Sequence, residues 1–206
     1  MHPLLSDEGQ AALEEAIEAI EERCAAEVVV AVHRRAGAYG RAQVVLGVLV
    51  ALLAQAFFLY SSIAFPLPIF LVGPFALGLL GSLLGRLPAL ERLFASRVQM
   101  RLRVRMAAEA AFYRHDVSHT RERTGIVVYV ALFERRGEVV GDSGVLRQRP
   151  IEAWDAAVAE LDATLAAGGE IGAVTAALTR LGDVLSLCLP WRSGVNELDN
   201  AVLGDG

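Results

Sequence analysis

Two histidines and an aspartate lie close together in the middle of the chain, at His115, Asp116 and His119. Histidines four residues apart share one face of a helix, and such a pair can bind zinc. The sequence has no HExxH pattern here, however, and the helix that precedes these residues is expected to end at this point. We therefore interpret them as loop histidines rather than as a zinc site.

The other side chains that could act as nucleophiles do not occur in catalytic motifs. Neither the serines nor Thr124 lie in a nucleophile elbow, and the chain has no Gly-rich phosphate loop or dinucleotide fingerprint. Cys24 and Cys188 are far apart in the sequence and lack a CxxC partner or metal-ligand spacing. We expect two buried free thiols, because a disulfide would require an oxidising compartment.

An uncharged apolar block from Val44 to Gly85 dominates the organisation of the chain. It contains no charged residue across 42 positions and is interrupted once, at Phe65-Pro66-Leu67-Pro68. Each half is close to the ~20 residues that a membrane-spanning helix needs. The sequence therefore predicts a two-helix transmembrane hairpin at residues 41–88, with spans at about 44–65 and 67–85.

Charge is segregated along the chain. Residues 1–40 carry a net charge of −5, residues 86–115 carry +5 and residues 116–206 carry −6. The basic segment directly follows the apolar block, which favours a membrane-facing helix over a nucleic-acid-binding surface. Arginines flank the block on both sides and are absent from its central turn. The positive-inside rule therefore predicts an integral, multi-pass protein with both termini in the cytoplasm.

The basic segment is predicted to form a juxtamembrane helix at residues 89–115 that continues into the soluble domain. Its apolar residues, Leu102 and Met106 among them, keep helical spacing, and every fourth residue from Arg97 to Arg105 is arginine. We expect the first half of this helix to lie on anionic headgroups and the second half, from Met106 to Phe112, to pack on a sheet.

The soluble part of the chain alternates helices and strands. This order predicts an α/β layered domain with a mixed sheet, split by the apolar block into residues 5–40 and 98–203. The strand before the block is expected to pair with the first strand after it. The predicted elements are a helix at Ser6–Cys24, strands at Glu27–His33, Ile126–Phe133 and from Val139, and helices at Ile151–Ala167 and Glu170–Leu189.

This order, together with particular residues, resembles the TPM-domain family. The matching stretches are Glu27-Val28-Val29-Val30, Ala107 to Phe112, Arg123-Thr124-Gly125-Ile126-Val127-Val128-Tyr129-Val130, Glu138-Val139-Val140-Gly141-Asp142-Ser143-Gly144, Leu189-Pro190 and Asn196-Glu197-Leu198. The closest likeness is to short bacterial members described only as predicted membrane proteins. The resemblance implies an α/β/α sandwich with a small mixed sheet, and we expect a place in the bacterial inner membrane. The two spans lie between the first strand and the next helix, unlike the usual single span after the domain.

The resemblance also implies a candidate site. Family members have been linked to photosystem repair, receptor modulation and weak acid phosphatase activity, sometimes with a bound divalent cation. The family pattern places an acid, here Asp142, at a strand end, where a carboxylate can hold a cation such as calcium. Glu197 and Asp199 would add oxygen ligands if the tail folds back. Alternatively, Asp142 is an ordinary turn residue before Ser143 and Gly144.

Two functions of different classes follow from these observations. The favoured one is a non-enzymatic interaction or assembly module at the cytoplasmic membrane face, whose partners are the bilayer and another membrane protein but not nucleic acid. The alternative is a weak divalent-cation-dependent phosphatase that uses Asp142 and neighbouring carboxylates.

Overall fold

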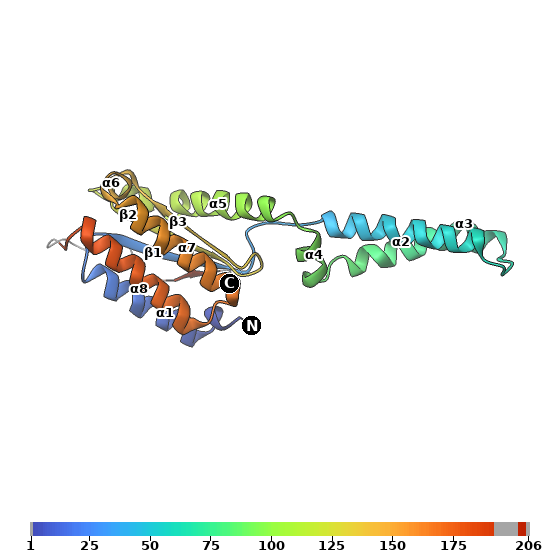
Figure 1. Ribbon diagram of the computed structural model, residues 1–206, viewed down its shortest axis with the longest axis horizontal. Coiled ribbons are helices and arrows are strands. Elements are labelled where there is room, and N and C mark those ends of the chain that lie inside the picture. The colour runs from blue at the N-terminus through green and yellow to red at the C-terminus, as the bar shows by residue number, and fades with distance from the viewer. Residues whose placement is uncertain (1, 192–201, 205–206) are drawn as a thin grey trace. The chain divides into compact units, whose positions relative to one another are not determined.

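The structure, a computed structural model, describes residues 2–191 and 202–204, which belong to two compact units (Figure 1). The first unit, the α/β domain, is formed by residues 1–36 and 101–206. The second unit, residues 37–100, contains the apolar block. The second unit is therefore an insertion in the sequence of the α/β domain, whose two parts fold together.

A four-stranded mixed sheet forms the centre of the α/β domain. The strands lie in the order β3-β2-β1-β4, with β1 parallel to both β2 and β4 and with β2 antiparallel to β3. The predicted pairing of the strand before the apolar block with the strand after it is confirmed, in the register Glu27 with Gly125 to His33 with Ala131. The strands are β1 (Glu27–His33), β2 (Gly125–Ala131), β3 (Arg136–Gly141) and β4 (Leu203–Gly204).

The valine-rich composition of β1 and β2 follows from their central positions. All seven residues of β2 and five of the seven in β1 are buried. Because both faces of these strands are covered, neither alternates apolar with polar residues. Strand β2 ends at Ala131, two residues before the predicted end, because the chain turns there and the amide of Arg135 donates to the carbonyl of Leu132 at 3.3 Å.

Three helices cover one face of the sheet (Figure 1). They are α1 (Asp7–Glu21), α7 (Ile151–Ala167) and α8 (Ile171–Cys188), preceded by the short 3-10 helix η1 (Pro3–Leu5). Leu13 and Ile17 of α1 pack with Leu161 of α7 and Leu178 of α8, and all four side chains are almost fully buried. Helix α7 ends as predicted at a glycine pair, where Gly168 and Gly169 have positive φ angles.

Helix α5 (Arg97–Arg114) covers the opposite face, which completes a three-layer α/β/α arrangement. The predicted single helix from Leu90 to Arg114 is wrong, since the chain forms α4 (Pro88–Phe94) and then α5 with a break at Ala95 and Ser96.

The prediction that Met106 to Phe112 of α5 pack on the sheet is confirmed for Ala108, Ala111 and Phe112 but not for Met106. Val104, Ala108 and Ala111 pack on the sheet, whereas Leu102 and Met106 are exposed. Small side chains let the helix axis approach the sheet, so the inward face is not the one with the largest apolar residues.

The loop between α5 and β2 corrects a further expectation. The sequence predicts that Gly125 adopts a positive φ, but it is Arg123 that does so, with φ of 57°. Gly125 is required for a different reason, because a Cβ there would lie 2.2 Å from the carbonyl oxygen of Val117. Val117 belongs to the 3-10 helix η2 (Val117–His119), which packs directly over the start of β2.

The second unit contains two long antiparallel helices, α2 (Arg41–Tyr60) and α3 (Leu67–Leu84). Small residues line their interface, as is common where membrane helices pack closely. A Cβ added to Gly78 would lie 2.9 Å from the Cβ of Ala51, and one added to Gly81 would lie 2.8 Å from the Cβ of Val50. The glycines therefore set the close approach of the two helices.

Three helices in the described part of the chain are long and apolar enough to cross a membrane, namely α2, α3 and α8. The apolar side of α8 packs in the core of the α/β domain, through Val174, Leu178 and Leu185. In α2 and α3 the large apolar side chains instead point outward: Phe75, for example, is 75% exposed. Such large exposed apolar surfaces are unusual for helices in water.

The turn between β2 and β3 is held by one carboxylate of α7. Asp162 lies 2.9 Å from the guanidinium of Arg136 and accepts a hydrogen bond from the amide of Gly137 at 3.2 Å. Both ends of the ion pair are mostly buried. We expect Asp162→Ala to lower the free energy of unfolding by about 2 kcal/mol, because it leaves a charged donor and an amide without their acceptor.

Urea unfolding in mild detergent measures this effect. The matched control is Asp183→Ala, which removes a more exposed ion pair with Arg23 and should cost about 0.5 kcal/mol. Equal effects of the two substitutions would contradict the assignment of Asp162 as a clamp on the hairpin.

Candidate functional site

Asp142 lies at the end of β3, directly before the short helix α6 (Ser143–Gln148). Its side chain accepts a hydrogen bond from the amide of Ser143 through Oδ1, so it caps α6. The turn interpretation of the sequence therefore needs a correction, because the residues after Asp142 continue as a helix rather than only reversing the chain. The Asp142 side chain is 7% exposed.

The second carboxylate oxygen of Asp142 is the most distinctive polar atom of this region. Oδ2 is buried and has no hydrogen-bond donor among the described residues. The Nη1 atom of Arg123 lies 3.7 Å away, on a side chain that is mostly exposed. A buried carboxylate oxygen without a donor is energetically costly, and either a nearby cationic side chain or a bound cation reduces that cost.

The backbone around Asp142 is held on two sides. The amide of Asp142 donates to the carbonyl of Gly125 at 2.9 Å, and the amide of Gly144 donates to the carbonyl of Arg123 at 3.0 Å. A Cβ on Gly144 would lie 2.4 Å from that same carbonyl oxygen. These contacts fix both Asp142 and the left-handed residue Arg123, so the carboxylate and the guanidinium are held by the same framework.

The remaining predicted cation ligands, Glu197 and Asp199, lie outside the described residues. Within residues 2–191 and 202–204, no three His, Cys, Asp or Glu side chains form a group that could hold a metal ion. In this part of the chain, the group that the structure brings to Asp142 is therefore the guanidinium of Arg123.

The histidine cluster lies at the end of α5, as the sequence analysis expects. Asp116 and His119 are largely exposed, and their side chains lie 3.2 Å apart. Burial lowers the pKa of His115, and the neighbouring Arg114 lowers it further. Asp116 adopts a left-handed backbone conformation, with φ of 55°, that ends the helix. The geometry is that of a helix terminus and a loop.

The two cysteines are free thiols. Cys24 is buried, and its Sγ donates to the carbonyl of Ile20 at 3.2 Å, whereas Cys188 is half-buried. Burial raises the pKa of both thiols, which disfavours the thiolate form that acts as a nucleophile.

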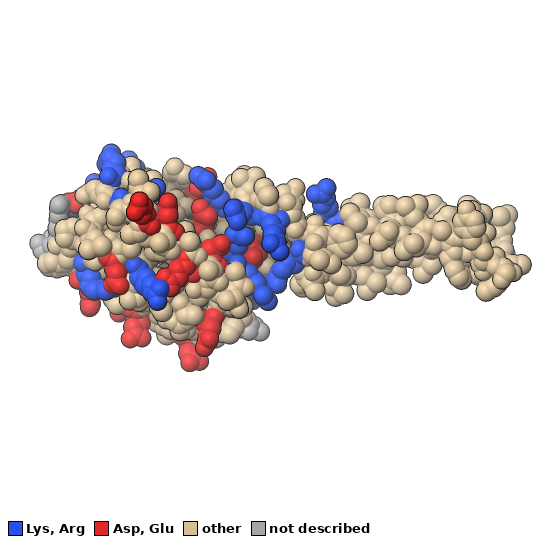
Figure 2. Space-filling view, in the orientation of Figure 1, with Lys and Arg blue, Asp and Glu red and all other residues tan. Residues whose placement is uncertain are grey.

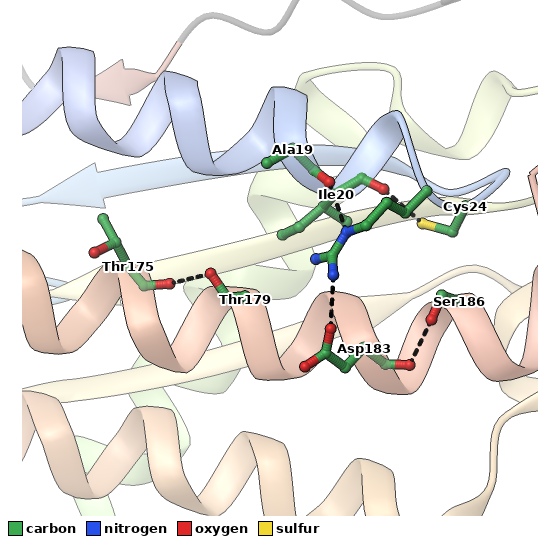
Figure 3. Close-up of polar contacts among 8 residues, drawn as sticks. Ala19, Ile20, Cys24, Thr175, Thr179, Asp183 and Ser186 are labelled. Atoms are coloured by element: carbon green, nitrogen blue, oxygen red, sulfur yellow. Dashed lines mark hydrogen bonds and ion pairs between the residues drawn. The ribbon is translucent and has the colours of Figure 1, made fainter.

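The surroundings of Cys24 connect two helices (Figure 3). Arg23 donates to the carbonyl of Ala19 at 2.9 Å and forms an ion pair with Asp183 of α8 at 2.7 Å. This region therefore joins the end of α1 to α8, which is a structural role.

The outer face of α5 is a surface that the sequence analysis identifies only in part, in the first half of the helix. We define it by Leu102, Met106 and Tyr113, which are 57%, 60% and 70% exposed. Arginines gather over this part of the α/β domain, whereas the visible surface of α2 and α3 is almost free of charge (Figure 2). The sequence signal for this face is the helical spacing of Leu102 and Met106, of which the sequence analysis assigned Met106 to the sheet side.

Comparisons with known proteins show the fold of this chain but not its family. No protein-family model matches it, and no curated protein matches it. Among solved structures, the NMR structure of the BA42 protein from the psychrophilic bacterium Bizionia argentinensis is similar, with a TM-score of 0.59 and 15% sequence identity. The similarity covers 98% of this chain and 95% of that chain. At this level of identity the likeness supports the α/β fold alone.

Proposed function

We propose that this protein is a membrane-anchored α/β domain, in which α2 and α3 cross the bilayer as a hairpin. The main support for the proposal is the distribution of side chains in these helices, which is the reverse of that in a water-soluble helix pair. Glycines such as Gly78 and Gly81 lie between them, while large apolar residues such as Phe75 point outward. That distribution is stable in lipid, where helices associate through small residues rather than by burying large ones.

The sheet topology supports an even number of spans. Strand β1 precedes the hairpin and β2 follows it, and the two strands pair along their whole length. Both ends of the hairpin must therefore emerge on the same side of the membrane. Arginines precede α2 and follow α3, so we propose that this side is the cytoplasm, at the inner membrane of a bacterium.

For the domain itself we propose a non-enzymatic role in interaction or assembly with another membrane protein. The resemblance to the TPM-domain family supports this role, as does the acidic surface of α1. Glu14, Glu15, Glu18 and Glu22 are exposed on that helix, opposite the side that packs in the core. A row of carboxylates on one helix fits a basic surface of a partner.

Affinity purification of the full chain in mild detergent tests the proposed role. We expect a stoichiometric membrane-protein partner that is lost when Glu14 and Glu18 are replaced with lysine. The control replaces Glu152 and Asp155 of α7 with lysine, since these residues are also exposed. Failure of the parent protein to retain any stoichiometric partner would contradict the proposal.

A cation-dependent phosphatase is the second candidate, and it rests on the buried Oδ2 of Asp142. If Asp142 is a calcium ligand, added calcium should raise the melting temperature of the full chain in detergent, because a ligand of the folded state stabilises it. We expect Asp142→Asn to weaken calcium binding by about tenfold or more and to abolish any phosphate-ester hydrolysis.

The matched control for this prediction is Asp155→Asn, an exposed carboxylate of α7 that should leave both measurements unchanged. A parent protein whose melting temperature does not respond to calcium would remove the support for a cation at Asp142. The Arg123 ion pair would then account for the buried carboxylate by itself.

A further inference from the structure

The apolar side chains of α5 that do not face the sheet lie along one side of the helix, in a row that Glu109 interrupts between Met106 and Tyr113. Leu102, Met106 and Tyr113 recur at helical spacing, so they lie on one side of the helix. Each is more than half exposed, whereas Val104 and Ala108 on the opposite side are completely buried. Core packing therefore does not explain these three residues.

Arginines border this row on both sides. Helical geometry places Arg105 along one border, and Arg103 and Arg114 along the other, whereas Arg97 and Arg101 lie on the side of Val104 and Ala108. The helix contains a single acidic residue, Glu109, whose carboxylate is 3.1 Å from the guanidinium of Arg105. The outer face of α5 therefore carries apolar residues between flanking arginines, and the ion pair of Arg105 with Glu109 crosses it.

The combination of apolar residues and arginines on the outer face of α5 indicates which kind of surface this face binds. A helix that lies in the membrane interface inserts apolar residues among the acyl chains while its arginines contact anionic headgroups. A second copy of the same helix fits less well, because a symmetric pair would bring arginine rows of like charge together. Charge complementarity thus favours an anionic lipid surface.

We propose that the outer face of α5 binds the anionic lipid surface of the membrane that anchors the protein. This inference rests on the proposed insertion of α2 and α3 into that membrane. Only a short stretch of chain separates Leu84, the end of α3, from Leu102. Binding of α5 is consequently an intramolecular event, which gives weak contacts with lipid a high effective concentration.

The proposal assigns different tasks to the two faces of the α/β domain. The α5 side is held against the anionic bilayer, while the acidic surface of α1, on the other side of the sheet, is repelled by it. The surface of α1 therefore stays available for a protein partner.

Fluorescent labels in lipid nanodiscs test this surface in the full chain. A background with Cys24→Ala and Cys188→Ala carries one new cysteine for an environment-sensitive dye, at Met106→Cys, Glu14→Cys or Phe75→Cys. The discs contain phosphatidylcholine alone or with phosphatidylglycerol. We expect the dye at residue 106 to shift to the blue and to be quenched by nitroxide lipids only in the anionic discs, while the dye at residue 14 remains accessible to aqueous iodide in both.

Arginine variants test the electrostatic part. Each of Arg103→Gln and Arg105→Gln should lower the ratio of lipid-bound to free states by about fivefold, and Arg180→Gln, on α8, should leave it unchanged. High salt should have the same effect as the variants, because it screens exposed charges.

Two results would overturn the inference while leaving the hairpin intact. One is a dye at residue 106 that remains accessible to iodide in anionic discs, although the dye at residue 75 is quenched by nitroxide lipids. The other is protection of residue 106 that requires two copies per disc and is independent of lipid charge, which would indicate self-association. If the dye at residue 75 is instead accessible to iodide, this result would contradict the proposed membrane insertion of α3 and also the inference that depends on it.

Discussion

Replacing Gly125 with alanine is expected to lower the free energy of unfolding of the α/β domain by about 3 kcal/mol. The new Cβ would lie 2.2 Å from the carbonyl oxygen of Val117 and 2.7 Å from its Cγ1 atom. Neither segment can move away easily. Gly125 pairs with Glu27 in the sheet, and its carbonyl accepts a hydrogen bond from the amide of Asp142.

Thermal unfolding in mild detergent, followed through the buried Trp154, measures this loss. Gly172→Ala is the matched control, because a Cβ at Gly172 meets nothing within 4 Å and the residue lies in α8. Alanine should stabilise that helix by up to about 1 kcal/mol. If both variants unfold at the same temperature, the close contact between η2 and the start of β2 does not exist in solution.

An arginine at Phe75 is expected to prevent most of the hairpin from entering the membrane. Phe75 lies near the middle of α3, and its side chain points away from α2. Replacing an apolar residue by arginine at the centre of a span costs about 3 kcal/mol, which corresponds to roughly a hundredfold change in the insertion equilibrium. This expectation depends on the proposed membrane insertion of α2 and α3.

The fraction of protein that resists carbonate extraction from membranes reports insertion. Leu187→Arg is the control, since Leu187 is an equally exposed apolar residue, but it belongs to α8 of the α/β domain. Its replacement should not change the membrane-bound fraction. Full retention of the Phe75→Arg protein in the membrane would contradict the hairpin topology.

Much of the fold can be predicted from local patterns in the sequence. The runs of β-branched residues locate β1 and β2, and the glycine pair at Gly168 locates the end of α7. The pairing of β1 with β2 was predictable because, once the apolar block is left out, the order of helices and strands is that of a single α/β domain. Each of these features depends on residue types that are strongly biased towards one structure.

The features that sequence reasoning missed depend on contacts between distant segments. The inward face of α5 is determined by how closely Ala108 and Ala111 approach the sheet, whereas the sequence analysis also assigned Met106 to that face. The left-handed conformation of Arg123 was assigned to Gly125, because glycine is the usual residue there. A hydrogen bond from the amide of Gly144 in α6 to the carbonyl of Arg123 holds this residue in place, and the sequence gives no sign of it.

The candidate site also contains one residue that could be selected from the sequence and one that could not. Asp142 could be selected from the sequence, and it is a buried carboxylate at a strand end. Its partner Arg123 could not be selected, because the two residues meet only when the loop before β2 packs on α6. Glu197 and Asp199 lie outside the described residues, so their predicted role as ligands stays a prediction.

The parallel pairing of β1 with β2 has a consequence for biosynthesis. Residues 34–124 separate the two strands, so the ribosome makes both helices of the apolar hairpin before β2 exists. A strand pair with such a large separation in sequence forms late and slowly. The valines of β1 have no neighbouring strand during this time. Under the proposed membrane insertion of α2 and α3, closure of the sheet therefore requires that both ends of the hairpin emerge on the same side of the membrane, and a chain with a wrongly inserted hairpin would not complete its domain.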